Sequence, residues 1–215
     1  MATETKQATC AERVDAHMAS RFADLKVLFR TADCDAEELR DYLSGLGGDQ
    51  CECDSCKGSG WVDAEGEATT EDADGAEECS DCDGSGLDRD EADEQLREEV
   101  CNYGLSFDYV APDTFGDQPE GYWRYQFSTG GPADELRLYG DHQAGRPHKM
   151  EYWFLDWFDG AFRHLSGDAA DTGRAIWDDF GGMGMLESTY EAAMEDYEPR
   201  ADEDNDDSDD DEAEE

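Results

Sequence analysis

The sequence predicts an α+β protein in which helices at both ends of the chain pack on a four-stranded antiparallel sheet. Apolar residues recur at helical spacing in the first part of the chain and again from residue 172 onward. Between residues 101 and 157 the period changes to two, which is typical of strands. The stretch from Cys51 to Gly86 has glycine, cysteine and acidic residues but almost no apolar ones, so a hydrophobic core cannot order it.

Residues 1–50 are predicted to form two helices. The first covers residues 9–30 and begins with a Thr-x-x-Glu capping box, in which two side chains satisfy free backbone N–H groups. The second begins at Asp35 with the related Asp-x-x-Glu pattern. The glycine pair at positions 47 and 48 is expected to end it.

Residues 87–198 are predicted to hold a third helix at 87–100, the sheet, and closing helices at 172–180 and 186–197. Turn residues separate the four strands, so each strand should pair with its neighbour along the chain. The last strand is apolar on both faces, which places it centrally or under a helix. The residues that alternate with polar ones are Leu105, Phe107 and Tyr109; Trp123, Tyr125 and Phe127; Leu136 and Leu138; Met150, Tyr152 and Phe154.

The composition indicates a protein from a halophile, and residues 199–215 are predicted to form a disordered acidic tail. Asp and Glu total 59 against 16 Lys and Arg, a formal charge of −43, yet 11% of the residues are aromatic. Disordered acidic chains lack such aromatics. Molar salt reconciles the two observations, because the Debye length falls to about 3 Å at 1 M and screens the self-repulsion. We therefore expect a halophilic archaeon or one of its viruses as the source.

No stretch of the sequence resembles a leader peptide or a membrane span. The longest dense apolar run, residues 152–155, is far shorter than the roughly 18 residues that a span needs. We expect a soluble protein of the host cytoplasm, with a place in a virion left open. In a reducing compartment the eight cysteines point toward metal before disulfides, but Cys10, Cys34 and Cys101 lie in helical or strand patterns and are expected to be small buried hydrophobic residues.

Two segments, 53–60 and 79–86, share the pattern C-x-x-C-x-G-x-G. Two residues between cysteines let both thiolates point at one ion, and two such knuckles supply the four ligands of a closed, structural zinc site. A β-hairpin starting at Trp61-Val62 is expected between them. Disulfides, a redox pair and Cys51 as a competing ligand remain alternatives. The predicted ligands of one structural zinc are Cys53, Cys56, Cys79 and Cys82.

The repeated motif resembles the cysteine-rich domain of the J-protein chaperones, the DnaJ family. The resemblance covers residues 53–86 and implies a zinc-stabilised module that contacts proteins. That family carries a second pair of repeats and a second zinc, whereas the two repeats here imply one zinc. The family's His-Pro-Asp tripeptide, which engages its partner chaperone, is absent from this sequence, so a co-chaperone role is not expected.

A second resemblance covers residues 103–161. The segments 103–110, 121–128, 130–132 and 152–161 are similar to a domain of uncharacterised phage and plasmid proteins. This resemblance implies a viral or plasmid origin and carries no mechanism.

The leading functional hypothesis is a non-enzymatic interaction protein with a protein partner. An acidic DNA mimic that blocks a host defence nuclease is the first alternative. Nucleic-acid binding through the knuckles is the second, and it is not favoured because Lys57 is their only basic residue. Asp156 and Asp159 form the one candidate catalytic pair, but among 59 acidic residues such a pair arises by chance. The candidate interaction residues are Trp61, Tyr122, Arg124, Trp153 and Trp157.

Overall fold

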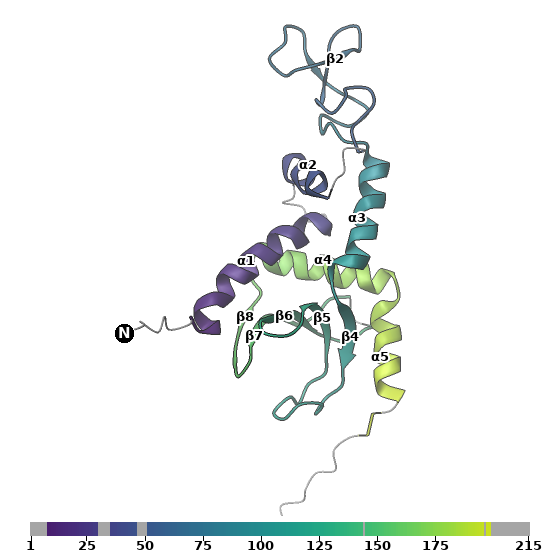
Figure 1. Ribbon diagram of the computed structural model, residues 1–215. Helices are drawn as coiled ribbons and strands as arrows, with labels where there is room; N and C mark the ends of the chain where they lie inside the picture. The colour runs from purple at the N-terminus through teal and green to yellow at the C-terminus, as the bar shows by residue number, and fades with distance from the viewer. Residues whose placement is uncertain (1–7, 30–34, 47–50, 144, 196, 199–215) are drawn as a thin grey trace, which may run out of the picture.

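A computed structural model describes residues 8–29, 35–46, 51–143, 145–195 and 197–198, and Figure 1 shows its elements. The predicted acidic tail and the glycine pair expected to end the second helix therefore lie outside the described residues. The helices of the described part are α1 (Cys10–Leu28), α2 (Ala36–Gly45), α3 (Arg89–Tyr103), α4 (Asp168–Gly182) and α5 (Met185–Glu195).

The main sheet has five antiparallel strands in the order β4-β5-β6-β7-β8, so the prediction of four strands was one too few. The missed strand is β8, which carries few apolar residues and follows a two-residue turn, Trp157-Phe158, without glycine, proline or asparagine. β7 lies between β6 and β8, as expected for a strand that is apolar on both faces. The strands are β4 (Ser106–Val110), β5 (Tyr122–Ser128), β6 (Ala133–Tyr139), β7 (Lys149–Asp156) and β8 (Asp159–His164).

The core lies between this sheet and the helices that cross one of its faces (Figure 1). α1 packs on β7 and β8, whereas α5 packs on β4 at the other edge. Because side chains alternate along a strand, one set of residues enters the core and the other set faces away from the helices. The residues of the sheet buried in the core include Trp123, Tyr125, Phe127, Leu136, Leu138, Tyr152 and Phe154.

The predicted helix starts are confirmed by their capping contacts. The backbone N–H of Thr9 donates to Glu12 at 2.8 Å, and that of Glu38 donates to Asp35 at 2.9 Å. α4 begins at Asp168, four residues before the predicted start, and Gly184, with φ +74°, separates it from α5. Glycine adopts such a φ without strain, so Gly184 allows the chain to change direction between α4 and α5.

A second, small sheet lies beyond the N-terminal end of α3, away from the main sheet (Figure 1). Its order is β2-β1-β3, with β1 at Trp61–Val62, β2 at Ala68–Thr69 and β3 at Glu77–Glu78. The hairpin expected at Trp61-Val62 is therefore present, and β3 adds a third strand. No helix in the described parts of the chain combines the length and the apolar character of a transmembrane segment.

Candidate metal centre

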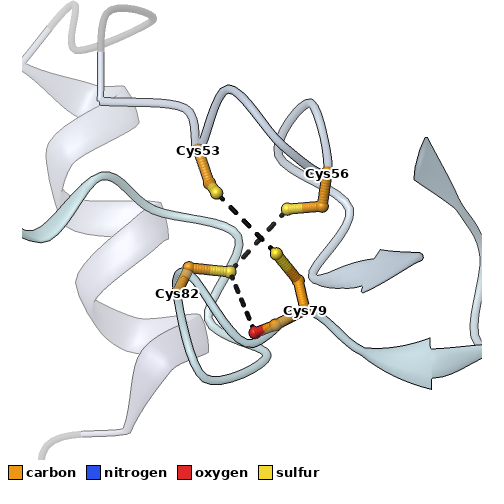
Figure 2. Close-up of side chains that lie close together, drawn as sticks. All are labelled: Cys53, Cys56, Cys79 and Cys82. Carbon is orange, nitrogen blue, oxygen red and sulfur yellow. Dashed lines mark hydrogen bonds between the residues drawn. The ribbon is translucent and has the colours of Figure 1, made fainter. Parts of the chain in front are cut away.

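Four cysteine side chains converge at the base of the small sheet (Figure 2). All four Sγ atoms lie within 4.8 Å of one another, with 4.0 Å between Cys53 and Cys79 and 3.7 Å between Cys56 and Cys82. A tetrahedral zinc with Zn–S bonds of about 2.3 Å holds its sulfurs about 3.8 Å apart. All four side chains are buried and none is in a disulfide. The cluster therefore has the dimensions of a structural metal site.

Each knuckle aims a backbone N–H group at a sulfur. The N–H of Gly60 donates to Cys56 Sγ and that of Gly86 donates to Cys82 Sγ, both at 3.2 Å. The glycines of the repeat thus let the chain turn back toward the sulfurs. The residues after each second cysteine that adopt positive φ are Lys57, Gly58 and Gly60 in the first knuckle and Asp83, Gly84 and Gly86 in the second.

The same glycines let the two knuckles approach each other, which the sequence analysis did not anticipate. A Cβ at Gly60 would lie 2.3 Å from the carbonyl oxygen of Gly84, and a Cβ at Gly86 would lie 2.3 Å from that of Gly58. Backbone hydrogen bonds also cross between the knuckles at 2.8 and 2.9 Å. The pattern C-x-x-C-x-G-x-G thus encodes a pseudo-twofold pair in which only hydrogen fits at the contact.

Burial and nearby hydrogen bonds shift the pKa values of the clustered thiols in different directions. Burial raises the pKa of Cys79 and of Cys82. Burial also acts to raise the pKa of Cys53, but hydrogen bonds from the backbone N–H groups of Cys56 and Ser55 outweigh it and lower that pKa. Buried thiolates without a counter-charge are costly, and a metal cation supplies that charge when it replaces the protons.

The remaining described cysteines lie outside the cluster. Cys51, the alternative ligand, is buried in the main core and its Sγ donates to Gln95 on α3 at 3.2 Å. Cys10 is buried as predicted, whereas Cys101 was predicted to be buried and is exposed. Cys34 lies outside the described residues. The hydrogen bond from Cys51 to Gln95 links the cysteine module to α3.

The predicted interaction residues are not gathered on one surface. Tyr122 is completely buried, so the prediction that it forms part of an accessible surface was wrong. Arg124 is engaged by Asp108 through two hydrogen bonds of 3.0 and 2.6 Å. Trp61 lies in the small sheet, and Trp153, in β7, donates its indole N–H to Glu151 at 2.9 Å. Tyr122 is buried in a small cluster with Val110 and Tyr139, and the guanidinium of Arg137 lies 4.7 Å from the centre of its ring.

Trp157 alone of that set is strongly exposed, at 84%, and its neighbour Phe158 is exposed at 103%. Phe158 was not among the predicted interaction residues. Its position in a two-residue turn could have been found only by recognising β8, because the turn is defined by the pairing of Asp156 with Asp159.

Asp156 and Asp159, the candidate catalytic pair, hold α1 against the β7–β8 hairpin. Asp159 accepts a hydrogen bond of 2.6 Å from the backbone N–H of Cys10, and Asp156 forms a 2.5 Å ion pair with Arg13. The hydrogen bond from the N–H of Cys10 lowers the pKa of Asp159. The structure thus gives both carboxylates a positioning role.

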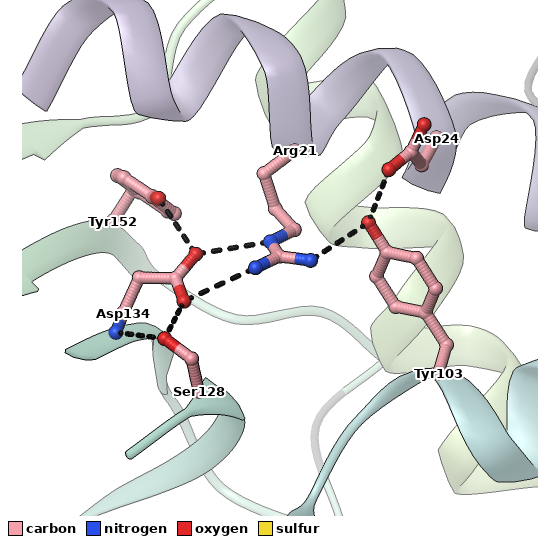
Figure 3. A network of polar contacts seen from close by, with 6 residues as sticks. All are labelled: Arg21, Asp24, Tyr103, Ser128, Asp134 and Tyr152. Atoms are coloured by element: carbon pink, nitrogen blue, oxygen red, sulfur yellow. Dashed lines mark hydrogen bonds and ion pairs between the residues drawn. The ribbon is translucent and has the colours of Figure 1, made fainter. Parts of the chain in front are cut away.

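A buried polar network that the sequence did not reveal joins α1, α3 and the sheet (Figure 3). Asp134 accepts two hydrogen bonds from Arg21, at 2.9 and 3.2 Å, and one from Tyr152 at 2.8 Å. Arg21 also donates to Tyr103 at 3.1 Å, and Tyr103 donates to Asp24 at 2.7 Å. Burial raises the pKa of both tyrosines, so their hydroxyls stay protonated and act as donors. The groups satisfy one another, which is the arrangement of a structural clamp.

The chain was compared with protein-family models, with curated proteins and with solved structures, and none of the three comparisons found a match.

Proposed function

We propose that the chain is a non-enzymatic interaction protein whose cysteine module is ordered by one structural zinc ion and whose partner is a protein. The observation that carries the proposal is the closed cluster of four buried cysteines. Four thiolates in tetrahedral array favour zinc or an iron–sulfur centre, and the sulfur separations suit a single ion.

The site is proposed to be structural because protein atoms fill every position of the tetrahedron. A catalytic zinc keeps one position for water or substrate, and three protein ligands are then usual. Here the fourth position belongs to a cysteine as buried as the other three. Zinc therefore supplies the folding energy that the module's few apolar residues cannot supply.

The charges at the knuckles support a protein partner over a nucleic acid. Lys57 lies 3.2 Å from Asp54, and Arg89, at the start of α3, lies 2.5 Å from Asp83. Both of these basic side chains are thus paired with an acid of the module, and Arg40 of α2, which reaches the second knuckle, donates to the backbone carbonyl of Ser85. Nucleic-acid binding relies on Lys and Arg side chains that neutralise phosphates. Lys57 and Arg89 already form ion pairs within the chain.

Cobalt substitution tests the closed site. We expect Co²⁺ to give the visible spectrum of tetrahedral thiolate coordination and that spectrum to stay unchanged when azide is added. Cys82→Ala, which opens one position, should respond to azide and serves as the positive control. A response of the unaltered protein to azide would mean an open position and would favour a catalytic metal.

We also propose that the protein works in the cytoplasm of a halophilic archaeon as a viral or plasmid product. The support is the formal charge of −43 in a chain that nevertheless builds an aromatic core. Folding should then be weak below about 0.5 M KCl and strengthen toward several molar, as repulsion is screened. Circular dichroism across a KCl series measures this. Equal folding in dilute buffer would contradict the halophilic origin.

A further inference from the structure

The tip of the β7–β8 hairpin displays two aromatic side chains to solvent. Trp157 and Phe158 are its two turn residues, and both are exposed almost completely. Trp157 has φ +56°, a left-handed conformation that glycine or asparagine adopts more readily than a residue with a large side chain. An exposed ring also lacks the stabilisation that burial would give it. The backbone strain and the two exposed rings at this turn point to a contact made outside the chain.

Contacts with α1 hold this tip in one orientation. Besides the Asp156 and Asp159 contacts with α1, Arg163 on β8 pairs with Asp15 at 2.7 and 2.8 Å. A Cβ on Gly131 would lie 2.7 Å from the indole nitrogen of Trp157, so that indole edge rests directly against the backbone of the preceding hairpin. A side chain held in place before binding loses less entropy on binding.

A hollow of about 230 Å³ lies beside Trp157, between the tip and the start of α1. The indole of Trp157 forms one wall, and the polar groups of the hollow include the carboxylates of Asp156 and Asp159. Arg13 forms an ion pair with Asp156. An aromatic face next to a carboxylate is the environment in which a guanidinium binds, because the ring attracts the cation and the acid accepts its N–H groups. The residues lining the hollow are Ala8, Thr9, Cys10, Asp156, Trp157 and Asp159.

The chain itself uses this combination within its fold. The guanidinium of Arg137 lies 3.9 Å from the ring centre of Trp153 and donates to Glu135 at 2.6 Å. Two further guanidiniums do the same, Arg13 over Phe154 with Asp156 and Arg21 over Phe127 with Asp134. The hollow beside Trp157 supplies the ring and the carboxylate of such a set.

We propose that the hollow beside Trp157 binds an arginine side chain of the partner protein, stacked on the indole and paired with Asp159, while Phe158 covers the partner's apolar surface next to it. Arginine is chosen over lysine because its planar guanidinium stacks on a ring and binds a carboxylate at the same time. In molar salt this pairing acts at contact distance, because the Debye length is only about 3 Å. The inference rests on the proposed function, since it names the chemistry of the protein partner.

The test is an NMR titration of the ¹⁵N-labelled, zinc-loaded full chain in 1 M KCl with N-acetyl-arginine amide. Its uncharged isostere, N-acetyl-citrulline amide, is the matched probe. We expect saturable shifts at the backbone amides of Gly160 and Ala161 and at the Trp157 indole, with the arginine probe binding about tenfold more tightly than the citrulline probe.

Three variants assign the contact, each followed at Gly160 and Ala161. Trp157→Leu keeps an apolar side chain without a π face, and Asp159→Asn keeps an acceptor for the Cys10 N–H without the charge; each should weaken the arginine probe at least fivefold. Phe162→Leu, which alters an exposed ring elsewhere on β8, should leave binding unchanged. Equal binding of both probes, shifts that do not saturate, or full binding to Trp157→Leu would overturn the proposal. None of these outcomes alters the zinc content, so the zinc proposal is tested separately.

Discussion

Cys53→Ser should release the zinc and unfold residues 51–86 while the five-stranded sheet stays folded. The only buried residues of the module's own cluster are its four cysteines, with Val62 partly buried against them. Zinc binding to such small sites is worth about 10–16 kcal/mol and is coupled to their folding. The sheet has its own core, which does not include the four ligands. Elemental analysis should find one zinc per unaltered chain and none in the variant, and limited proteolysis should cut the module in the variant but not in the unaltered chain.

Cys101→Ser is the matched control, because Cys101 is exposed and lies outside the cluster. A second pair of variants leaves every thiol in place. Gly60 and Gly66 share a φ of +81°, but a Cβ at Gly60 meets the Gly84 carbonyl whereas nothing lies within 4 Å of one at Gly66. Gly60→Ala should therefore lose zinc to a chelator far faster than Gly66→Ala. Equal loss from both, or an unaltered protein with no zinc or with two, would show that the site is misassigned.

Asp134→Ala should lower the free energy of unfolding by about 3 kcal/mol, at the lower end of the range for a broken buried ion pair. The Asp134 side chain is 6% exposed, and its loss leaves the Arg21 guanidinium and the hydroxyl of Tyr152 without their acceptor. The Arg21 side chain remains 25% exposed, so water relieves part of the penalty. Urea unfolding in molar KCl measures the change as a shift of the midpoint at constant slope.

Asp108→Ala provides the comparison, since Asp108 also receives two hydrogen bonds from an arginine but its side chain is 42% exposed. Its loss should cost less than about 1 kcal/mol. If both substitutions cost the same, burial is not what makes the Arg21–Asp134 pair matter, and the clamp between α1 and the sheet is not a stability element.

Short-range patterns predicted much of this fold. Capping side chains act within three residues, so the starts of α1, α2 and α3 could be placed from the sequence. The four clustered cysteines could be predicted because the spacing within each knuckle is local and the same pattern occurs twice. β8 was not predicted because its few apolar residues give no clear alternation. The turn before it also has no glycine, proline or asparagine. Cys101 was placed in the core although it lies on the solvent face of α3.

The helix starts, the two cysteine knuckles and the period of the first four strands could be predicted from the sequence, because each depends on residues only a few positions apart. The burial of Tyr122, the Arg21–Asp134 clamp and the use of Asp156 and Asp159 to hold α1 arise only when the elements pack together. These contacts join positions more than a hundred residues apart or on different strands. Which acid among 59 meets an arginine or a helix end depends on how the elements pack, and no local pattern records that packing.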